Sequence, residues 1–406
     1  MCHRRRTAYA RGRPGLRSPR RLGGVLLLLG LTVAAAPANL RAAQGGAGER
    51  AAPPPRPALV EPAVSAAYRD AIEAAREAVR RTMDEAGIPG VSVAVGVNGE
   101  IVWSEGFGWA DLEQRVPVTP LTRFRVGSVS KPMTAAALGL LVDEGALDLD
   151  APVQRYVPGF PEKRWPITTR QVAGHIAGIR HYRGTEMLSS RHYGSVEAGL
   201  EIFAADTLLF EPGTRYSYSS YGWNLISAVV EGASGRPFLE FMDERVFAPL
   251  GLRHTTADQV WLIVPHRTRF YARGPTGRIV NAPFVDNSYK WAGGGFLSTP
   301  EDLVRFGTAH LRPGFLRQET LDEWFTSQRL NDGTETGYGI GWRTTIDERG
   351  ERVVSHSGGS VGGTTMLIVN RDRGLVVAAV GNLSSGPIPA LGRRIHEIFR
   401  DHLDGR

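Results

Sequence analysis

Residues 127–131 read Gly-Ser-Val-Ser-Lys and place a hydroxyl three residues before an amine. The apolar stretch that follows, 135–141, predicts a helix. Residues three apart share one face of a helix, so the hydroxyl of Ser128 and the amine of Lys131 can meet. Pro132 requires this helix to begin near Ser128, because proline is tolerated in the first turn and breaks a helix interior. The pattern therefore predicts a nucleophilic serine with a lysine as its base.

Lysine is rare in this chain, which gives Lys131 added meaning. Of the 48 Lys and Arg residues, the only lysines are Lys131, Lys163 and Lys290. Where a surface charge alone is needed, the chain nearly always uses Arg. Arg cannot lose its proton, whereas a partly buried Lys can, as a catalytic base must. The alternative is that Ser128 caps a helix while Lys131 is solvated, since this short pattern is common by chance.

Two further stretches carry groups that could serve the same reaction. Residues 216–220 read Tyr-Ser-Tyr-Ser-Ser, just before a predicted helix, and a phenol there could pass a proton to a departing amine or alcohol. Residues 353–359 read Val-Val-Ser-His-Ser-Gly-Gly and predict a strand end. Its backbone N–H groups could lie along a substrate carbonyl. Taken alone, the tyrosines could be loop packing and His356 an ordinary histidine.

These three stretches, in this order, resemble the serine β-lactamase and penicillin-binding-protein superfamily. Tyr in the second stretch and His in the third are typical of the branch related to class C β-lactamases and D-Ala-D-Ala carboxypeptidases. Within that branch the chain is most similar to the mitochondrial serine β-lactamase-like members, which are protease-like. The resemblance covers residues 65–402, and its matching stretches are 124–131, 147–157, 178–182 and 285–299.

The resemblance implies a role for each matching residue. Ser128 would be the nucleophile, Lys131 the general base and Tyr218 the proton shuttle. The backbone N–H groups of Ser128 and Gly359 would form the oxyanion hole. The residues expected to contact the substrate or its oxyanion are His356, Ser357, Gly358, Gly359 and Ser220.

Two positions depart from the family pattern. Ser220 stands where an Asn commonly follows the Tyr, which removes an amide that would grip an acyl-amide substrate. Ser357 replaces a more usual Thr, which is a milder change. The first departure argues against efficient β-lactam hydrolysis and leaves acyl transfer to water as the expected reaction, on an amide or an ester.

The order of periodic segments predicts the fold class. Helical spacing from 65 to 87 precedes alternating valines at 91–97 and a second strand at 101–109, which predicts a helix and a β-hairpin. Short strand-like runs return between 338 and 382, and 388–402 predicts a closing amphipathic helix. We therefore predict an α+β fold of the β-lactamase/transpeptidase type, an antiparallel sheet flanked by helices with an inserted all-helical region.

These segments also divide the chain. The mature domain is expected at 62–406, with a sheet region at about 62–120 and 285–406 and a helical region at about 121–284. Residues 39–61 are rich in Ala, Gly and Pro, which predicts an extended linker.

Residues 1–38 predict a cleaved signal peptide. Arginines without any acidic residue precede an apolar stretch of about 15 residues, shorter than the ~20 that span a bilayer. We therefore expect an exported protein, periplasmic or secreted, with no stable membrane span after cleavage. An Arg-rich leader also resembles a mitochondrial transit peptide. We rank that interpretation lower because the apolar stretch is compact rather than amphipathic.

The positive charge of the chain resides in this leader. The formal net charge is +7, and removal of the eight arginines of 1–38 leaves 40 basic against 41 acidic residues, a net charge of −1. The mature domain therefore has no electrostatic basis for nucleic-acid binding. The one cysteine, Cys2, lies in the leader, so the mature domain has neither a thiol nucleophile nor a thiolate metal site.

No metal or organic cofactor is expected. His175 and His181 are six residues apart in a loop-like segment without a suitably spaced third ligand. Gly293-Gly-Gly295 lacks a phosphate-loop context and predicts close backbone packing near the site. The expected partner is a small-molecule or peptide substrate, and self-association into a homo-oligomer stays open.

Two rival functions remain to be weighed. Residues 358–362 match the nucleophile elbow of α/β-hydrolases, with Ser360 as nucleophile and Asp372 and His396 following in the right order. That motif requires a helix directly after the serine, whereas 364–370 predicts a strand. The other rival is a non-catalytic scaffold or filament-forming module with a vestigial site, which the mitochondrial resemblance suggests. Against it, the three residues needed for acylation are all present.

Overall fold

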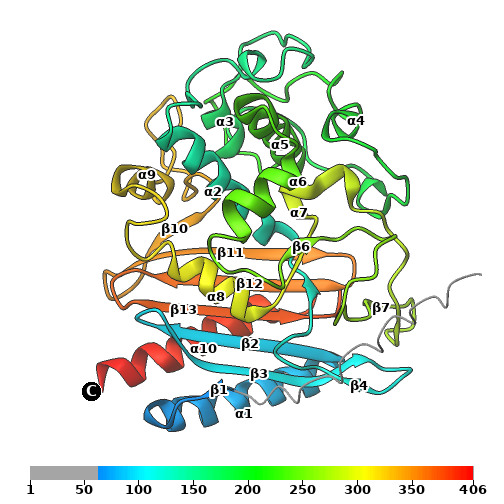
Figure 1. The fold of residues 1–406 in the computed structure, drawn as a ribbon, viewed down its shortest axis with the longest axis vertical. Coiled ribbons are helices and arrows are strands. Elements are labelled where there is room, and N and C mark those ends of the chain that lie inside the picture. Colours follow the sequence, from blue (N-terminus) through cyan, green and yellow to red (C-terminus); the bar gives the residue numbers. More distant parts are fainter. Residues whose placement is uncertain (1–62, 406) are drawn as a thin grey trace, which may run out of the picture. The chain divides into compact units, whose positions relative to one another are not determined.

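An antiparallel sheet brings both ends of the described chain together. The computed structural model describes residues 63–405, so the predicted signal peptide at 1–38 and the linker at 39–61 lie outside the described residues. The strand order is β1-β3-β2-β13-β12-β11-β10, with β4 paired to β3 (Figure 1). The strands are β1 (Ala63–Val64), β2 (Gly90–Val97), β3 (Glu100–Asp111), β4 (Val116–Pro117), β10 (Arg343–Ile346), β11 (Arg352–Ser360), β12 (Gly363–Asn370) and β13 (Leu375–Gly381).

The central strands are apolar because helices cover both of their faces. Every residue of β2, β12 and β13 is buried. β13 pairs with β2, with Leu375 opposite Val97 and Gly381 opposite Val91, so the N-terminal hairpin continues the C-terminal strands. This arrangement confirms the predicted α+β fold with an antiparallel sheet flanked by helices.

Two amphipathic helices cover one face of the sheet, and a third covers the other. On α1 (Arg69–Ala86) the buried residues Ile72, Ala75 and Val79 recur at helical spacing, and α1 packs beside α10 (Ile388–Asp404). The opposite face receives α8 (Pro300–Thr308), which packs on β2 and β13 (Figure 1). Alternate residues of each strand therefore point into two different cores.

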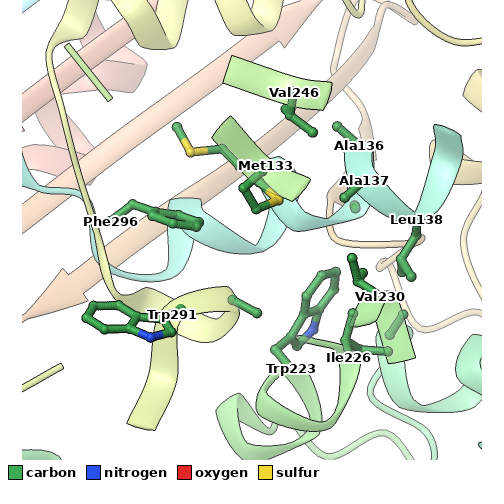
Figure 2. Packing of buried hydrophobic residues seen from close by; sticks show 14 of the residues in the cluster. Met133, Ala136, Ala137, Leu138, Trp223, Ile226, Val230, Val246, Trp291 and Phe296 are labelled. Atoms are coloured by element: carbon green, nitrogen blue, oxygen red, sulfur yellow. The ribbon is translucent and has the colours of Figure 1, made fainter. Parts of the chain in front are cut away.

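The inserted helices surround α2 (Ser130–Asp143), which is buried on nearly all sides. Side chains of α5, η5, α7 and β9 enclose it (Figure 2). A helix enclosed in this way must be apolar all round, which explains why its sequence shows no polar face. The remaining helices are α3 (Thr169–Ala173), α4 (Val196–Leu200), α5 (Ser220–Ser234), α6 (Phe238–Phe241), α7 (Trp291–Gly294), α9 (Gln318–Trp324), η1 (Ala66–Tyr68), η2 (Gly127–Val129), η3 (Val153–Arg155), η4 (Glu186–Leu188), η5 (Met242–Phe247) and η6 (Ser288–Lys290).

Four short strands, β5 to β8, lie within the region that the sequence pattern predicts as mainly helical, and a fifth, β9, lies just after it. They form one sheet in the order β5-β9-β6 and one β7-β8 pair. Strands of two or three residues are too short to show the alternation by which strands are recognised in a sequence. Their bounds are β5 (Phe124–Arg125), β6 (Thr256–Ala257), β7 (Tyr271–Arg273), β8 (Ile279–Asn281) and β9 (Phe296–Ser298).

Gly232 allows the closest contact of α5 with a neighbouring segment. A Cβ added there would lie 1.8 Å from the Tyr156 carbonyl oxygen, so Gly232→Ala should destabilise the protein by about 1–3 kcal/mol or more, although Ala is the better helix former. Gly222→Ala in the same helix is the control, because its Cβ would lie no closer than 3.3 Å to any neighbouring atom, the nearest being a Val172 methyl carbon. Urea unfolding of both variants measures the difference, and equal stabilities would contradict this packing.

Candidate active site

Ser128 and Lys131 lie side by side at the start of α2. Lys131 Nζ is 3.0 Å from Ser128 Oγ. Ser128 is in the η2 turn that leads from β5 into α2, and its side chain is partly exposed, whereas Lys131 is completely buried. The first turn of a helix also presents backbone N–H groups that have no partner within the helix. The hydroxyl is thus accessible from outside while the amine supports it from within.

The surroundings of Lys131 favour an uncharged amine. Its Nζ lies 2.6 Å from the Gly293 carbonyl oxygen and 3.2 Å from Ser220 Oγ, and within residues 63–405 it forms no ion pair with a carboxylate. Burial lowers the pKa of Lys131 well below its usual 10.5, and the charge of Lys290 lowers it further. A neutral amine has two N–H groups for Gly293 and Ser220, which leaves its lone pair for the Ser128 hydroxyl.

Tyr218 also lies beside Ser128. Its hydroxyl is within hydrogen-bonding reach of Ser128 and Ser220, and its ring centre lies 4.9 Å from Lys131 Nζ. Burial raises the pKa of Tyr218, so the phenol keeps its proton at neutral pH. Such a phenol is able to donate a proton to a leaving group.

Two histidines hold the backbone that carries Tyr218. His175 Nδ1 accepts a hydrogen bond from the Ser219 N–H, and His181 Nδ1 accepts one from the Ser220 N–H, each at 3.1 Å. Burial is the main cause that lowers the pKa of both imidazoles, to about 4 for His181, so both stay neutral and can accept. The sequence analysis considered these histidines only as metal ligands, expected no metal there, and missed this role.

The glycines of β11 let the strand touch the nucleophile turn. A Cβ at Gly358 would lie 1.9 Å from the Val126 carbonyl oxygen, and one at Gly127, whose φ is +51°, would lie 2.6 Å from the Gly359 carbonyl oxygen. β10 pairs with β11 only as far as Ser355. Beyond that residue, the edge of β11 faces the turn that holds the nucleophile. Backbone N–H groups on both sides could therefore meet a substrate oxygen.

The expectations for Ser357 and His356 need correction. Neighbouring residues of a strand point to opposite faces, so Ser357 does not face Ser128. It lines a cavity of about 650 Å³ on the other face of the sheet, beside Arg393 and His396 of α10. His356 is only 2% exposed, with Nε2 2.9 Å from the Tyr338 hydroxyl and Nδ1 2.6 Å from the Ser357 carbonyl oxygen. Both ring nitrogens are engaged within the protein, so this side chain is not open to a substrate.

Two other groups differ from expectation. Ser220 is 3% exposed, and its hydroxyl faces Lys131, so it supports the amine instead of reaching into solvent. Lys290, which has no role in the sequence analysis, is 3% exposed, and burial together with the charge of Arg125 lowers its pKa to about 7. Arg125 itself forms a buried ion pair with Asp258, at 2.6 Å. The rarity of lysine was the only signal that could have singled out Lys290.

The arrangement around Ser360 does not form a nucleophile elbow. β12 follows almost at once where an α/β-hydrolase requires a helix. Asp372 pairs with Arg352 at 2.8 Å, and His396 Nε2 lies 3.3 Å from the Asn370 amide. Asp372 and His396 therefore have other partners, and the buried Ser360 hydroxyl has no hydrogen-bond partner among residues 63–405, so the three groups do not form a triad.

Comparisons with known proteins agree on one family. The family model described as Beta-lactamase matches residues 75–398. The human protein "Serine beta-lactamase-like protein LACTB, mitochondrial" is 32% identical, over 88% of this chain and 85% of its own length. Among solved structures, the octameric penicillin-binding protein homologue from Pyrococcus abyssi has a TM-score of 0.71 at 26% identity, over 81% of this chain and 77% of its own. A D-stereospecific amidohydrolase from Streptomyces sp. has a TM-score of 0.66 at 25% identity, over 81% of this chain and 99% of its own.

The expected export to the periplasm or the outside is contradicted by these relatives. Human, mouse and bovine relatives at 32% identity are mitochondrial proteins and point toward mitochondria. The error arose because an Arg-rich leader without acidic residues is common to both kinds of targeting segment. Within residues 63–405, no helix combines the length and apolar character needed to cross a membrane.

The buried amine predicts a pH-dependent stability. Because the pKa of Lys131 is lower in the folded protein than the 10.5 of an unfolded chain, the unfolded state binds its proton more tightly. Stability should therefore rise with pH between the folded-state pKa and 10.5, by at most about 1.4 kcal/mol per pH unit. Lys131→Met lacks this term, so wild type should gain stability relative to the variant from pH 7 to 10 in urea unfolding. A difference that stays constant with pH would mean that burial does not shift this amine.

Proposed function

The chain belongs to the beta-lactamase family, and from this premise we propose that it is a serine hydrolase that cleaves an amide or ester through a covalent acyl-enzyme. The observation that carries the proposal is the 3.0 Å contact between the accessible Ser128 hydroxyl and the fully buried Lys131 amine. Family membership supports acyl transfer in general, and the contact supplies the nucleophile and the base.

Acylation begins when the Ser128 oxygen attacks the substrate carbonyl carbon. The lone pair of neutral Lys131 takes the hydroxyl proton as the new O–C bond forms. The negative oxygen that develops is stabilised by the N–H groups of Ser128 and Gly359, where β11 lies against the nucleophile turn. When the C–N or C–O bond of the substrate breaks, Tyr218 protonates the leaving group and regains a proton from Lys131.

Deacylation repeats these steps with water in place of the leaving group. Lys131 and Tyr218 take a proton from the water as its oxygen bonds to the acyl carbon. The bond between that carbon and Ser128 then breaks, and the proton returns to the serine. The raised pKa of Tyr218 suits it to carry a proton rather than to act as an independent base.

The substrate is proposed to be a peptide-like amide or an ester rather than a β-lactam. At position 220 the family commonly has an Asn, whose side-chain amide would bind an acyl-amide substrate. This chain has a short serine hydroxyl there, and that hydroxyl is already bonded to Lys131. The D-stereospecific amidohydrolase among the similar structures supports amide chemistry on this fold. The alternative of a scaffold with a vestigial site finds no support in the site, because the nucleophile and its base are in contact.

Two further properties are proposed from the relatives. The mitochondrial relatives support a mitochondrial location, and the octameric homologue supports self-association of this chain. Sedimentation velocity of the purified protein tests the second. We expect a species heavier than one chain, and a monomer at all concentrations would refute it.

Covalent labelling tests the nucleophile. A fluorophosphonate probe should label the wild type at Ser128, as located by peptide mass mapping. Ser128→Ala should abolish labelling and lower kcat on p-nitrophenyl esters at least about a thousandfold. Ser360→Ala is the matched control and should keep both the labelling and the hydrolysis of p-nitrophenyl esters. Activity that survives the first substitution and disappears with the second would reverse the assignment, and a folded, unlabelled, inactive wild type would favour the scaffold.

A further inference from the structure

His181 presents an unused hydrogen-bond donor beside the nucleophile. The Ser220 backbone N–H can only donate, so His181 Nδ1, 3.1 Å away, must accept. A neutral imidazole carries one proton, which then lies on Nε2. The side chain is exposed, and among residues 63–405 no hydrogen bond engages its Nε2. The ring therefore offers an N–H group to whatever occupies the site.

Aromatic neighbours fix the orientation of this ring. His181 stacks on Tyr182, with ring centres 4.5 Å apart and an angle of 29° between planes. It also meets the Tyr218 ring edge to face at 5.6 Å. Burial and the nearby Lys131 lower the pKa of His181 to about 4, so its single donor is retained at neutral pH. A donor held in this way loses little conformational entropy when it binds a ligand.

Ser220 does not itself supply a donor to the substrate. The Ser220 hydroxyl is buried and lies 3.2 Å from Lys131 Nζ, and Tyr182 is also within its hydrogen-bonding reach. It is thus committed to the protein and cannot reach a substrate as a longer amide would. His181, held by the backbone N–H of the same residue, is itself exposed.

We propose that the Nε2–H of His181 donates a hydrogen bond to a second carbonyl oxygen on the acyl side of the substrate. The preferred substrates are then N-acylated amino acid esters or peptides rather than simple fatty acyl esters. This inference rests on the proposed hydrolase function and adds the substrate class. A site that supplies a matching donor discriminates against substrates that lack the acceptor.

Two substitutions separate substrate contact from support of the backbone. In His181→Asn the side-chain oxygen can still accept from the Ser220 N–H, in the place of Nδ1, but nothing remains at the position of Nε2. In His181→Gln the longer side chain can bring an amide N–H to the position of Nε2, but the acceptor for Ser220 is lost. The two variants therefore each keep one of the two functions of the ring.

Two esters with the same leaving group complete the experiment. N-acetyl-L-alanine p-nitrophenyl ester carries the second carbonyl, and p-nitrophenyl butyrate lacks it. His181→Asn should lower kcat/KM about tenfold more on the first ester than on the second, mainly through KM. His181→Gln should retain most of the preference for the N-acetylated ester. Fluorophosphonate labelling of Ser128 reports that each variant is folded with an intact nucleophile.

Other outcomes overturn the inference in distinguishable ways. If His181→Asn lowered kcat/KM equally on both esters, or kept the wild-type preference for the N-acetylated ester, Nε2 would not contact the acyl side of the substrate. A greater loss of preference in His181→Gln than in His181→Asn would assign His181 to positioning of the backbone alone. A wild type that hydrolyses neither ester and resists fluorophosphonate would instead remove the proposed hydrolase function, and this inference with it.

Discussion

A lysine amine buried without a carboxylate is the constraint on which the rest of the site depends. Burial disfavours the charged form, and a carboxylate partner would restore it. The surroundings of Lys131 offer only neutral acceptors, the Gly293 carbonyl and two serine hydroxyls. An amine in this setting is a base at neutral pH. The charge of the nearby Lys290 lowers the pKa of Lys131 further, and the charge of Arg125 in turn lowers the pKa of Lys290.

The fold supplies this environment by enclosing α2 on nearly all sides. The inserted helices form a second core around it (Figure 2). This core excludes water from Lys131, while the η2 turn keeps Ser128 near the surface. The sheet contributes from the other side, because β11 extends beyond β10 and lies against that turn. Glycine at 127 and 358 is a condition for this approach, since a side chain at either position would meet backbone atoms.

The site extends behind its reacting groups. His175 and His181 accept from successive backbone N–H groups at the start of α5, where a helix has no partners of its own for them. His356 and Tyr338 pack against this group and bond to each other. Their neutrality is a consequence of burial, so Tyr218 rests on a support that does not change charge near neutral pH.

The sequence by itself determined the contact between Ser128 and Lys131 and the fold class. The spacing of Ser128 and Lys131 suffices for their contact because both lie at one helix start, and local geometry is readable from local spacing. The valine alternation of β2 and the amphipathic pattern of α1 and α10 likewise follow from short-range periodicity. The glycine run at 293–295 indicated close packing, though not that its first carbonyl would receive the lysine amine.

Only the tertiary structure decided the direction of side chains and the electrostatic environment. Ser357 was assigned to the substrate from its place in a motif, but the register of β11 turns it to the opposite face. The charge on Lys131 depends on groups from 89 and 162 residues away, at positions 220 and 293, which no local pattern relates to it. Burial and long-range proximity are properties of the packed chain, so the pKa of the base and the unused donor of His181 became visible only there.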